Sequence, residues 1–422
     1  MTTMREVLPQ ATAEPNLPPT LQDFAKQRFE GLAGIARPTR KTEAWKYSAK
    51  RLNKLEGLQL AAQAGEENAP AELLLGGVQA HPLVLSNGKL PSSFPQIEGV
   101  QLKSFAALSE DEAQRVAKGL IATRDNLPFA EINHAGLGDG LYIEVAKNAQ
   151  VELPLHLILV HQGEGMSLPR IFVHLNQGSA LSVIESVCAV NASAEHSLIN
   201  QVTDCLVEDN AALTYYRVND DHDQLPQVAA TGVQLKRDAR LFSHVLSLGS
   251  PLGRHDLQVQ LLAPGAECDL NGVCVAQDRQ HYDHHTCIEH IAAHCTSNEN
   301  YRCIADDKAQ IVFNGRIHIH PDAQKTLGEM SNKNLLLSSE AEIDSKPELE
   351  IYADDVKCAH GTTIGQLNEK EVYYLKTRGI RDEQARQMLT LGFVLEIVRA
   401  APIADIAERW EQRLSELLSF ED

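Results

Sequence analysis

A turn signature recurs along the middle of the chain and narrows the folds that the sequence can adopt. Each copy begins with Gly, Asn, Asp or Glu, followed by a small residue, one spacer and an apolar residue or Cys. The small residues of five successive copies are separated by 30, 32, 28 and 27 residues; they are Ala149, Ser179, Ala211, Ala239 and Ala266. A repeat of this length indicates units of two or three short strands that stack on one another.

The segments between these turns are typical of strands. From residue 141 onward, short β-branched stretches such as 141–145, 157–160 and 171–173 are bounded by Gly, Asn and Asp. Strands that cannot bury both faces alone can bury them by stacking. We therefore expect a mainly β protein with a parallel β-helix core, a narrow aliphatic interior and small residues at the corners. The 43 residues between Ala266 and Ala309 leave a β-sandwich or a jelly roll open.

Helical periodicity is confined to the two ends of the chain. Thr20 is placed to cap an apolar stripe that runs to Phe29, and Ser109 with Glu112 matches a capping box. After Gly379, the helical period returns in two apolar stripes, which predict two helices that cover the last coil. We therefore divide the chain into three regions: an N-terminal helical or mixed domain (1–140), a β-helix core (141–366) and a C-terminal helical domain (367–422).

The charge balance disfavours several classes of partner. Lys and Arg number 38 and Asp and Glu number 57, which gives the net charge of −19. A surface of this sign repels nucleic acid and anionic membranes. The sequence has no apolar run that would span a bilayer, and its N-terminus lacks a basic segment followed by an apolar one, so we expect a cytoplasmic protein.

Cysteine and histidine gather in one stretch, at His281, His284, His285, Cys287, His290, His294, Cys295 and Cys303. Imidazole and thiolate suit zinc, copper or iron, so one hypothesis is a stand-alone cytosolic metal-binding β-helix enzyme that uses the 281–303 cluster. On a strand, however, His285 and Cys287 would lie on one face and His284 and His290 on the other, so they cannot all share one ion. The competing interpretation is a histidine-rich solvent face with cysteines packed inside. The chain contains no CxxC pair, and we expect its eight cysteines to be thiols.

Cys358 and His360 form a second candidate site. They are one residue apart, so on a strand both side chains leave the same face and can share a metal or act as thiolate and base. The sequence contains no Gly-x-Ser-x-Gly elbow, no phosphate-binding loop of the Gly-x4-Gly-Lys type and no Gly-x-Gly-x-x-Gly fingerprint. We therefore do not expect the chain to hydrolyse nucleotides or to hold a dinucleotide.

Six motifs in the last third of the chain resemble, in order, the core signature of the SufB/SufD family. They are FNGRI (313–317), AQKT (323–326), NKNLLL (332–337), KPELEI (346–351), DVKCAHG (355–361) and YYLKTRGI (373–380). More loosely, EAWKY (43–47) is similar to the family's N-terminal motif, and the C-terminal helices fit its helical domain. His360-Gly361 has the form of the SufD branch, whereas the SufB branch carries His-Glu at the matching pair.

This resemblance implies a right-handed parallel β-helix between two helical regions, and a scaffold for iron–sulfur cluster assembly rather than an enzyme. It implies pairing with SufB through the β-helix and with the SufC ATPase through the C-terminal helices. It assigns Cys358 and His360, near the SufB interface, to a transient iron–sulfur cluster or iron that is shared with SufB. A flavin is also associated with the family's complex, and no motif in this chain gives it a position.

Overall fold

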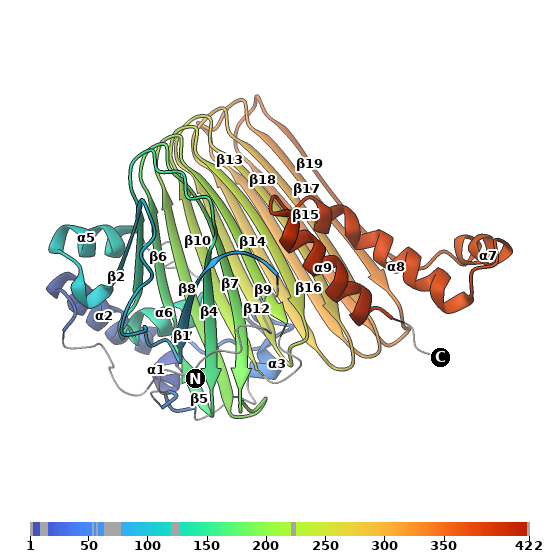
Figure 1. Ribbon diagram of the computed structural model, residues 1–422, viewed down its shortest axis with the longest axis horizontal. Helices are drawn as coiled ribbons and strands as arrows, with labels where there is room; N and C mark the ends of the chain where they lie inside the picture. The colour runs from blue at the N-terminus through green and yellow to red at the C-terminus, as the bar shows by residue number, and fades with distance from the viewer. Residues whose placement is uncertain are drawn as a thin grey trace.

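The core of the computed structural model is a parallel β-solenoid in which successive coils contribute strands to two facing sheets (Figure 1). The structure describes residues 3–8, 16–52, 55, 58–62, 77–119, 127–220 and 225–419. The nine-stranded sheet contains, in spatial order, β1 (His81–Ser86), β4 (Leu155–Gln162), β7 (Ala180–Val190), β9 (Ala212–Asp220), β11 (Arg240–Leu248), β13 (Glu267–Ala276), β15 (Thr296–Ala305), β17 (Leu327–Leu336) and β19 (Lys357–Gln366).

The second sheet has ten strands. Its spatial order is β18 (Glu342–Ile351), β16 (Gln310–Ile319), β14 (His281–His290), β12 (Gly253–Leu261), β10 (Gln227–Leu235), β8 (Ser197–Val207), β6 (Arg170–Leu175), β3 (Leu141–Val145) and β2 (Val100–Ser104), with β5 (Gly165–Ser167) paired to β8. Among the described strands, every pair is parallel except β2 with β3. The predicted parallel β-helix is confirmed, and the antiparallel β-sandwich and jelly roll are excluded.

The turn signature marks one corner of the solenoid. Its first residue adopts a left-handed backbone, with φ between 54° and 78°, at Asn148, Gly178, Asn210, Asp238 and Gly265. Gly, Asn and Asp tolerate this conformation best, which explains their recurrence. The residue that follows is buried at Ala211, Ala239 and Ala266.

The apparent break in the repeat comes from two different corners. Ala309 lies two residues after Asp307 at the opposite corner, between β15 and β16, so its distance from Ala266 is not one period. The first corner continues instead at His294 (φ 61°) and Lys325 (φ 62°). Neither residue is Gly, Asn, Asp or Glu, so the turn signature does not mark these two copies of the corner. The buried residue after His294 is Cys295, which takes the place of the alanine.

The space between the sheets holds a large apolar cluster, yet its interior is not wholly aliphatic. Glu185 and Arg217 are fully buried on inward-facing positions, with Nη1 of Arg217 3.3 Å from Oε2 of Glu185. The Glu185 carboxylate also accepts hydrogen bonds from the hydroxyls of Tyr215 (2.6 Å) and Thr203 (2.7 Å). The prediction of an aliphatic interior is therefore partly wrong, and these hydrogen bonds offset the desolvation of the buried charges.

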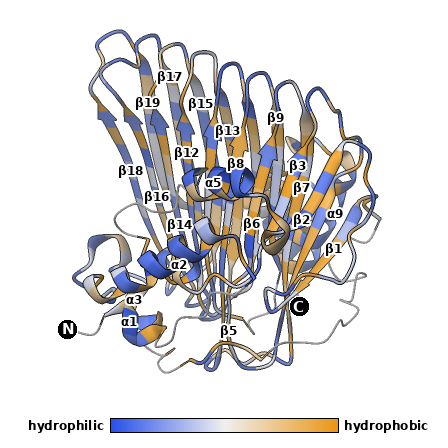
Figure 2. Ribbon diagram, turned by 90° about the vertical axis from the view of Figure 1, so that its left-hand side faces the viewer, coloured by the Kyte–Doolittle hydropathy of each residue, from blue (hydrophilic) through white to orange (hydrophobic). Residues whose placement is uncertain are grey.

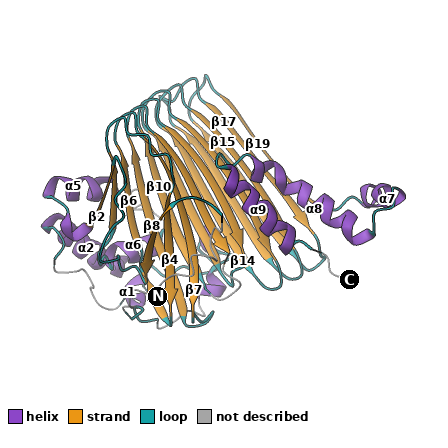
Figure 3. Ribbon diagram, viewed as in Figure 1, coloured by secondary structure: helices purple, strands orange, loops and turns teal. Residues whose placement is uncertain are grey.

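Helices of the N-terminal region cover the outer face of the ten-stranded sheet (Figure 3). They are α1 (Met4–Val7), α2 (Pro19–Gly31), η1 (Leu32–Gly34), η2 (Glu43–Trp45), α3 (Ala49–Leu52), η3 (Phe105–Ala107), α5 (Glu110–Gly119) and α6 (Pro128–Ala135). Trp45 is buried, with Cζ of Arg254 from β12 lying 3.7 Å from its ring centroid. This contact joins the EAWKY segment to the solenoid.

Two details of these helices test the predicted caps. The capping box is confirmed, because the Ser109 backbone N–H donates to Glu112 (2.8 Å) and the Glu112 N–H donates to the Ser109 hydroxyl (3.4 Å). The predicted Thr20 cap is wrong. Helix α2 already begins at Pro19, whose fixed φ suits the first helical turn, and the Thr20 hydroxyl instead bonds to Glu110 of α5.

The C-terminal helices are α7 (Glu369–Thr377), α8 (Asp382–Arg399) and α9 (Ala404–Leu417). The apolar stripe of α9, with Trp410 and Leu414, packs with the end of α8 on the outer face of the nine-stranded sheet. The prediction that these helices cover the last coil is therefore wrong. Side chains such as Tyr216 and Leu246 make that outer sheet face apolar, so burying it under the helices stabilises the fold. Helix α7 projects beyond the sheets (Figure 1).

Among the helices in the described ranges, none has both the length and the apolar content needed to cross a bilayer.

Replacing Trp410 with alanine should loosen the helical layer. The ring is 2% exposed and meets Tyr216 edge to face at 6.0 Å, so its loss leaves a large cavity. We expect a loss of about 3–5 kcal/mol in unfolding free energy, measured by chemical denaturation. Glu408→Ala, at an exposed position of the same helix, is the control and should change stability little. Equal effects of the two substitutions would contradict this packing.

Candidate functional site

Strands β18 and β19 form the last coil, and each lies at the edge of its sheet. Strand β19 is exposed along almost its whole length, whereas most alternate residues of β17, one coil earlier, are buried. In Figure 2, hydrophobic colour gathers on early strands such as β3 and β7, and hydrophilic colour increases toward β18 and β19. The solenoid thus ends in an open edge with unpaired backbone groups.

Cys358 and His360 lie on the inner face of this last coil. They are in register with Gly328 and Met330 of β17, and Met330 is buried in the cluster between the sheets. Cys358 packs against the same cluster and is half-buried, while His360 is exposed because no coil covers it. Their Cα atoms are about 6.6 Å apart along the strand, so the side chains can converge on one ion. The predicted shared face is confirmed.

The thiol and imidazole supply two ligands and no more. Partial burial raises the pKa of the Cys358 thiol, and a hydrogen bond with the Gly328 backbone acts in the opposite direction. In the isolated chain the thiol is therefore protonated at neutral pH, and it must release a proton when it binds a metal. Within the described part of the chain, no acidic, His or Cys side chain joins this pair to complete a three-ligand group.

The interior behind the site contains polar as well as apolar side chains. The Asn332 side-chain oxygen accepts hydrogen bonds from the Ser345 hydroxyl (2.7 Å) and from the Asn334 amide (2.6 Å). Met330 of β17 lies between His360 and Glu299 of β15, because the three residues are in register on successive strands. Burial raises the pKa of Glu299 to about 7, although the neighbouring Thr286 hydroxyl lowers it. The packed interior next to the open end therefore includes buried polar side chains.

The 281–303 cluster does not form the predicted metal site. His281, His284 and His290 are buried, and burial lowers the pKa of each to about 4. They make separate contacts: His281 with the Ser48 hydroxyl (3.0 Å), His284 stacked on Tyr282 (5.8 Å between centroids), and His290 with the Ser297 hydroxyl (2.8 Å). Within the described ranges, none of these histidines and cysteines belongs to a group that could hold a metal.

The competing interpretation of this stretch is right for the cysteines and wrong for most of the histidines. Cys295 and Cys303 pack as small apolar residues, and burial raises the pKa of Cys303 to about 12. All eight cysteines are free. His294 is exposed at a corner, and His285 and Cys287 face outward from β14, where His285 lies 2.8 Å from Asp283 and an Arg316 N–H donates to Cys287 Sγ at 3.4 Å.

One group of candidate ligands was missed by sequence reasoning. Glu289, His318 and His320 bring their ligand atoms within 4.8 Å of one another. The sequence signal for this group is the one-residue spacing of His318 and His320, which is the spacing that drew attention to Cys358 and His360. The glutamate, however, comes from a strand 29 residues earlier, and only the register of β14 with β16 places it there.

Comparison with known proteins agrees with the geometry. Residues 158–393 match the family model described as the SufBD core domain of SUF-system FeS cluster assembly. The chain belongs to the SufB/SufD family. This match includes both candidate sites, and membership gives the chain a role in iron–sulfur cluster assembly.

Several curated relatives match nearly the whole chain. The chain is 31% identical to the iron–sulfur cluster assembly protein SufD of Escherichia coli, over 89% of this chain and 88% of that protein. It is 29% identical to a SufBD family protein of Synechocystis, over 91% and 88%. It is 26% identical to a chloroplastic protein of Arabidopsis thaliana, over 96% and 88%. The resemblance to the SufD branch is confirmed.

Glu299 should make stability depend on pH. Its folded pKa of about 7 exceeds the ordinary value of 4.5, so the folded chain binds more protons between these values and loses stability as pH rises through them. Glu299→Gln should therefore stabilise the chain by about 3 kcal/mol at pH 8 and by almost nothing at pH 4.5, measured by denaturation at each pH. Glu267→Gln, at an exposed position, should show no such difference. A pH-independent effect of Glu299→Gln would contradict the assignment.

Proposed function

We propose that this chain is a SufD-type scaffold subunit that supplies Cys358 and His360 to a nascent iron–sulfur cluster, or to iron, at an interface with SufB. The observation that carries this proposal is the position of both side chains on the inner face of an uncovered last coil. Two ligands are too few for a cluster, since such clusters are held by about four. The remaining ligands therefore come from the chain that covers the open end.

The open edge supports pairing through the β-helix. Strands β18 and β19 have one unpaired side each, and an exposed edge of this kind recruits another strand. Ile351, Tyr352 and Ile364 of the last coil are large apolar side chains that stay exposed. A SufB solenoid docked end to end would bury these groups and continue both sheets.

The SufC ATPase is assigned to α7 and the exposed side of α8. The apolar stripe of α9 is not available, because it is buried on the nine-stranded sheet. Helix α7 instead projects from the molecule and exposes Tyr373 (69%) and Tyr374 (57%), with Met388 exposed on α8. Aromatic residues dominate the binding energy of many interfaces, which favours this surface as the dock.

The remaining parts of the proposal concern activity and location. We assign no catalytic residue to the chain, because its two interface ligands hold a substrate metal and the ATP chemistry belongs to SufC. Free cysteines fit the reducing cytoplasm, where we place the protein.

His360→Ala should impair cluster formation and leave folding intact. The ring is exposed at the open end, so its removal creates no buried cavity, but it removes one ligand. In a reconstituted SufB–SufC–SufD-type complex we expect iron and sulfide content to fall roughly tenfold at limiting iron, with complex assembly unchanged. Cys358→Ala should act non-additively with it, as two ligands of one ion do.

Lys357→Ala is the matched control for this experiment, since Lys357 is exposed on the opposite face of the same strand. Its complex should carry the wild-type cluster content. The proposed role of His360 is wrong if its variant also retains that content, or if the loss only follows a loss of assembled complex.

Replacing Tyr373 and Tyr374 together with alanine should weaken SufC binding. Both rings are exposed, so the chain should fold normally while the interface loses two aromatic anchors. We expect at least a tenfold rise in Kd by calorimetry, with SufB pairing unchanged by size-exclusion chromatography. Lys370→Ala, at an exposed position of the same helix, is the control. Unchanged affinity of the double variant would remove α7 as the dock.

A further inference from the structure

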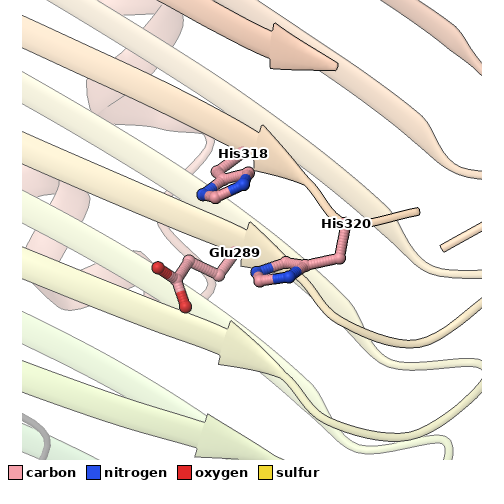
Figure 4. Close-up of side chains that lie close together, drawn as sticks. All are labelled: Glu289, His318 and His320. Atoms are coloured by element: carbon pink, nitrogen blue, oxygen red, sulfur yellow. The ribbon is translucent and has the colours of Figure 1, made fainter. Parts of the chain in front are cut away.

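The outer face of the ten-stranded sheet carries a polar row close to the open end. Strand register places Gln260, Glu289, His318 and Glu350 side by side on β12, β14, β16 and β18. His320 lies just beyond β16, two residues after His318, and its backbone N–H donates to the His290 carbonyl (3.0 Å). This hydrogen bond holds the chain beside Glu289, so both imidazoles lie next to one carboxylate (Figure 4).

We propose that Glu289, His318 and His320 bind a divalent first-row transition-metal ion of the Zn²⁺ or Fe²⁺ type. Two imidazoles and one carboxylate form a ligand set that such ions favour, with further positions left for water or another ligand. The three ligand atoms lie within 4.8 Å of one another. A tetrahedral ion bonded at about 2.1 Å holds its ligands ~3.4 Å apart, so binding requires the side chains to rotate and the stacked His318 and His320 rings to tilt away from parallel.

The surroundings of the three residues fit a metal better than a simple polar contact. Glu289 is only 4% exposed, and an amide N–H of Gln260 lies 3.4 Å from its Oε2, which orients the carboxylate. The His320 Nε2 atom is buried and has no hydrogen-bond partner among the described residues. A buried imidazole nitrogen without a partner costs free energy, and a metal bond would satisfy it.

Neighbouring groups of the last coil would support the bound ion. Oε2 of Glu350 lies 3.8 Å from Nδ1 of His318, a distance from which a carboxylate can orient a ligating imidazole. The His318 and His320 rings stack with centroids 4.4 Å apart, and Tyr352 flanks His318 at 5.4 Å. His318 keeps 22% of its side chain exposed, which gives an ion access from solvent.

This site is distinct from the pair at the open end. Glu289 and His318 point outward from the ten-stranded sheet, whereas Cys358 and His360 face the interior from the nine-stranded sheet. The inference therefore does not rest on the proposed interface function. All three ligands of this site come from one chain, so no partner is needed to supply them.

Metal binding by the full-length chain tests the proposal. Co²⁺ added stepwise under anaerobic conditions should give visible d–d absorption that saturates at one equivalent, and Zn²⁺ and Fe²⁺ added in separate arms should displace it. His318→Ala, His320→Ala and Glu289→Gln should each weaken binding by about 10- to 100-fold or more. The arm that displaces Co²⁺ at the lower concentration identifies the preferred ion.

Two controls separate this site from other ligands. His196→Ala removes an exposed histidine of a distant turn and should leave Co²⁺ binding unchanged. A Cys358→Ala/His360→Ala double variant should also keep it. The proposal is overturned if none of the three substitutions affects binding, if either control abolishes it, or if Zn²⁺ and Fe²⁺ both fail to compete. If Glu289→Gln alters the circular dichroism spectrum, the two histidine variants still test the proposal, because His318 and His320 are at partly exposed positions.

Discussion

Parallel, in-register pairing of each coil on the one before it is the constraint on which the rest of this structure depends. Because the pairing is in register, equivalent residues of successive coils form rows spaced by about 4.8 Å. One inner row passes from Tyr215 through Ser243, Leu270, Glu299 and Met330 to His360. An outer row contains Glu289 and His318. The grouping of Glu289 with His318 is therefore a consequence of register, whereas Cys358 and His360 share a face through local sequence and only their inner neighbours follow from register.

The same stacking leaves its end exposed, because β18 and β19 of the last coil each pair with a neighbouring strand on one side only. The C-terminal helices could have covered that edge, yet they lie on the outer face of the nine-stranded sheet. Six of the nine exposed large apolar side chains in the described ranges then fall between Ile351 and Met388. The chain has thus buried its apolar sheet face with its own helices, and it has left uncovered the coil that carries Cys358 and His360.

Sequence alone predicted the features that depend on local conformation. The recurring Gly, Asn and Asp positions predicted the corners of the solenoid, and the one-residue spacing of Cys358 and His360 predicted their shared face. Features that depend on which strands are neighbours could not be predicted. The buried Glu185–Arg217 pair joins residues that are 32 positions apart in the sequence. The apolar stripe of α9 packs on the outer face of the nine-stranded sheet, and the apolar residues of that face cannot be told from core residues in the sequence. The 281–303 histidines were misjudged for the same reason, since a buried imidazole and an exposed one have the same sequence signal.

In the proposed interface site, the raised pKa of Cys358 links metal binding to closure of the open end. In the isolated chain, partial burial already favours the protonated thiol. A partner that covered the last coil with apolar surface alone would desolvate the sulfur further and raise this pKa again, which opposes thiolate formation. An arriving cation has the opposite effect, because its charge stabilises the thiolate and the ion takes the place of the proton. In the proposed site, apolar closure and metal arrival therefore act on the thiol in opposite directions: the covered end holds a thiolate only when a metal is present, and loss of the metal returns the proton to sulfur.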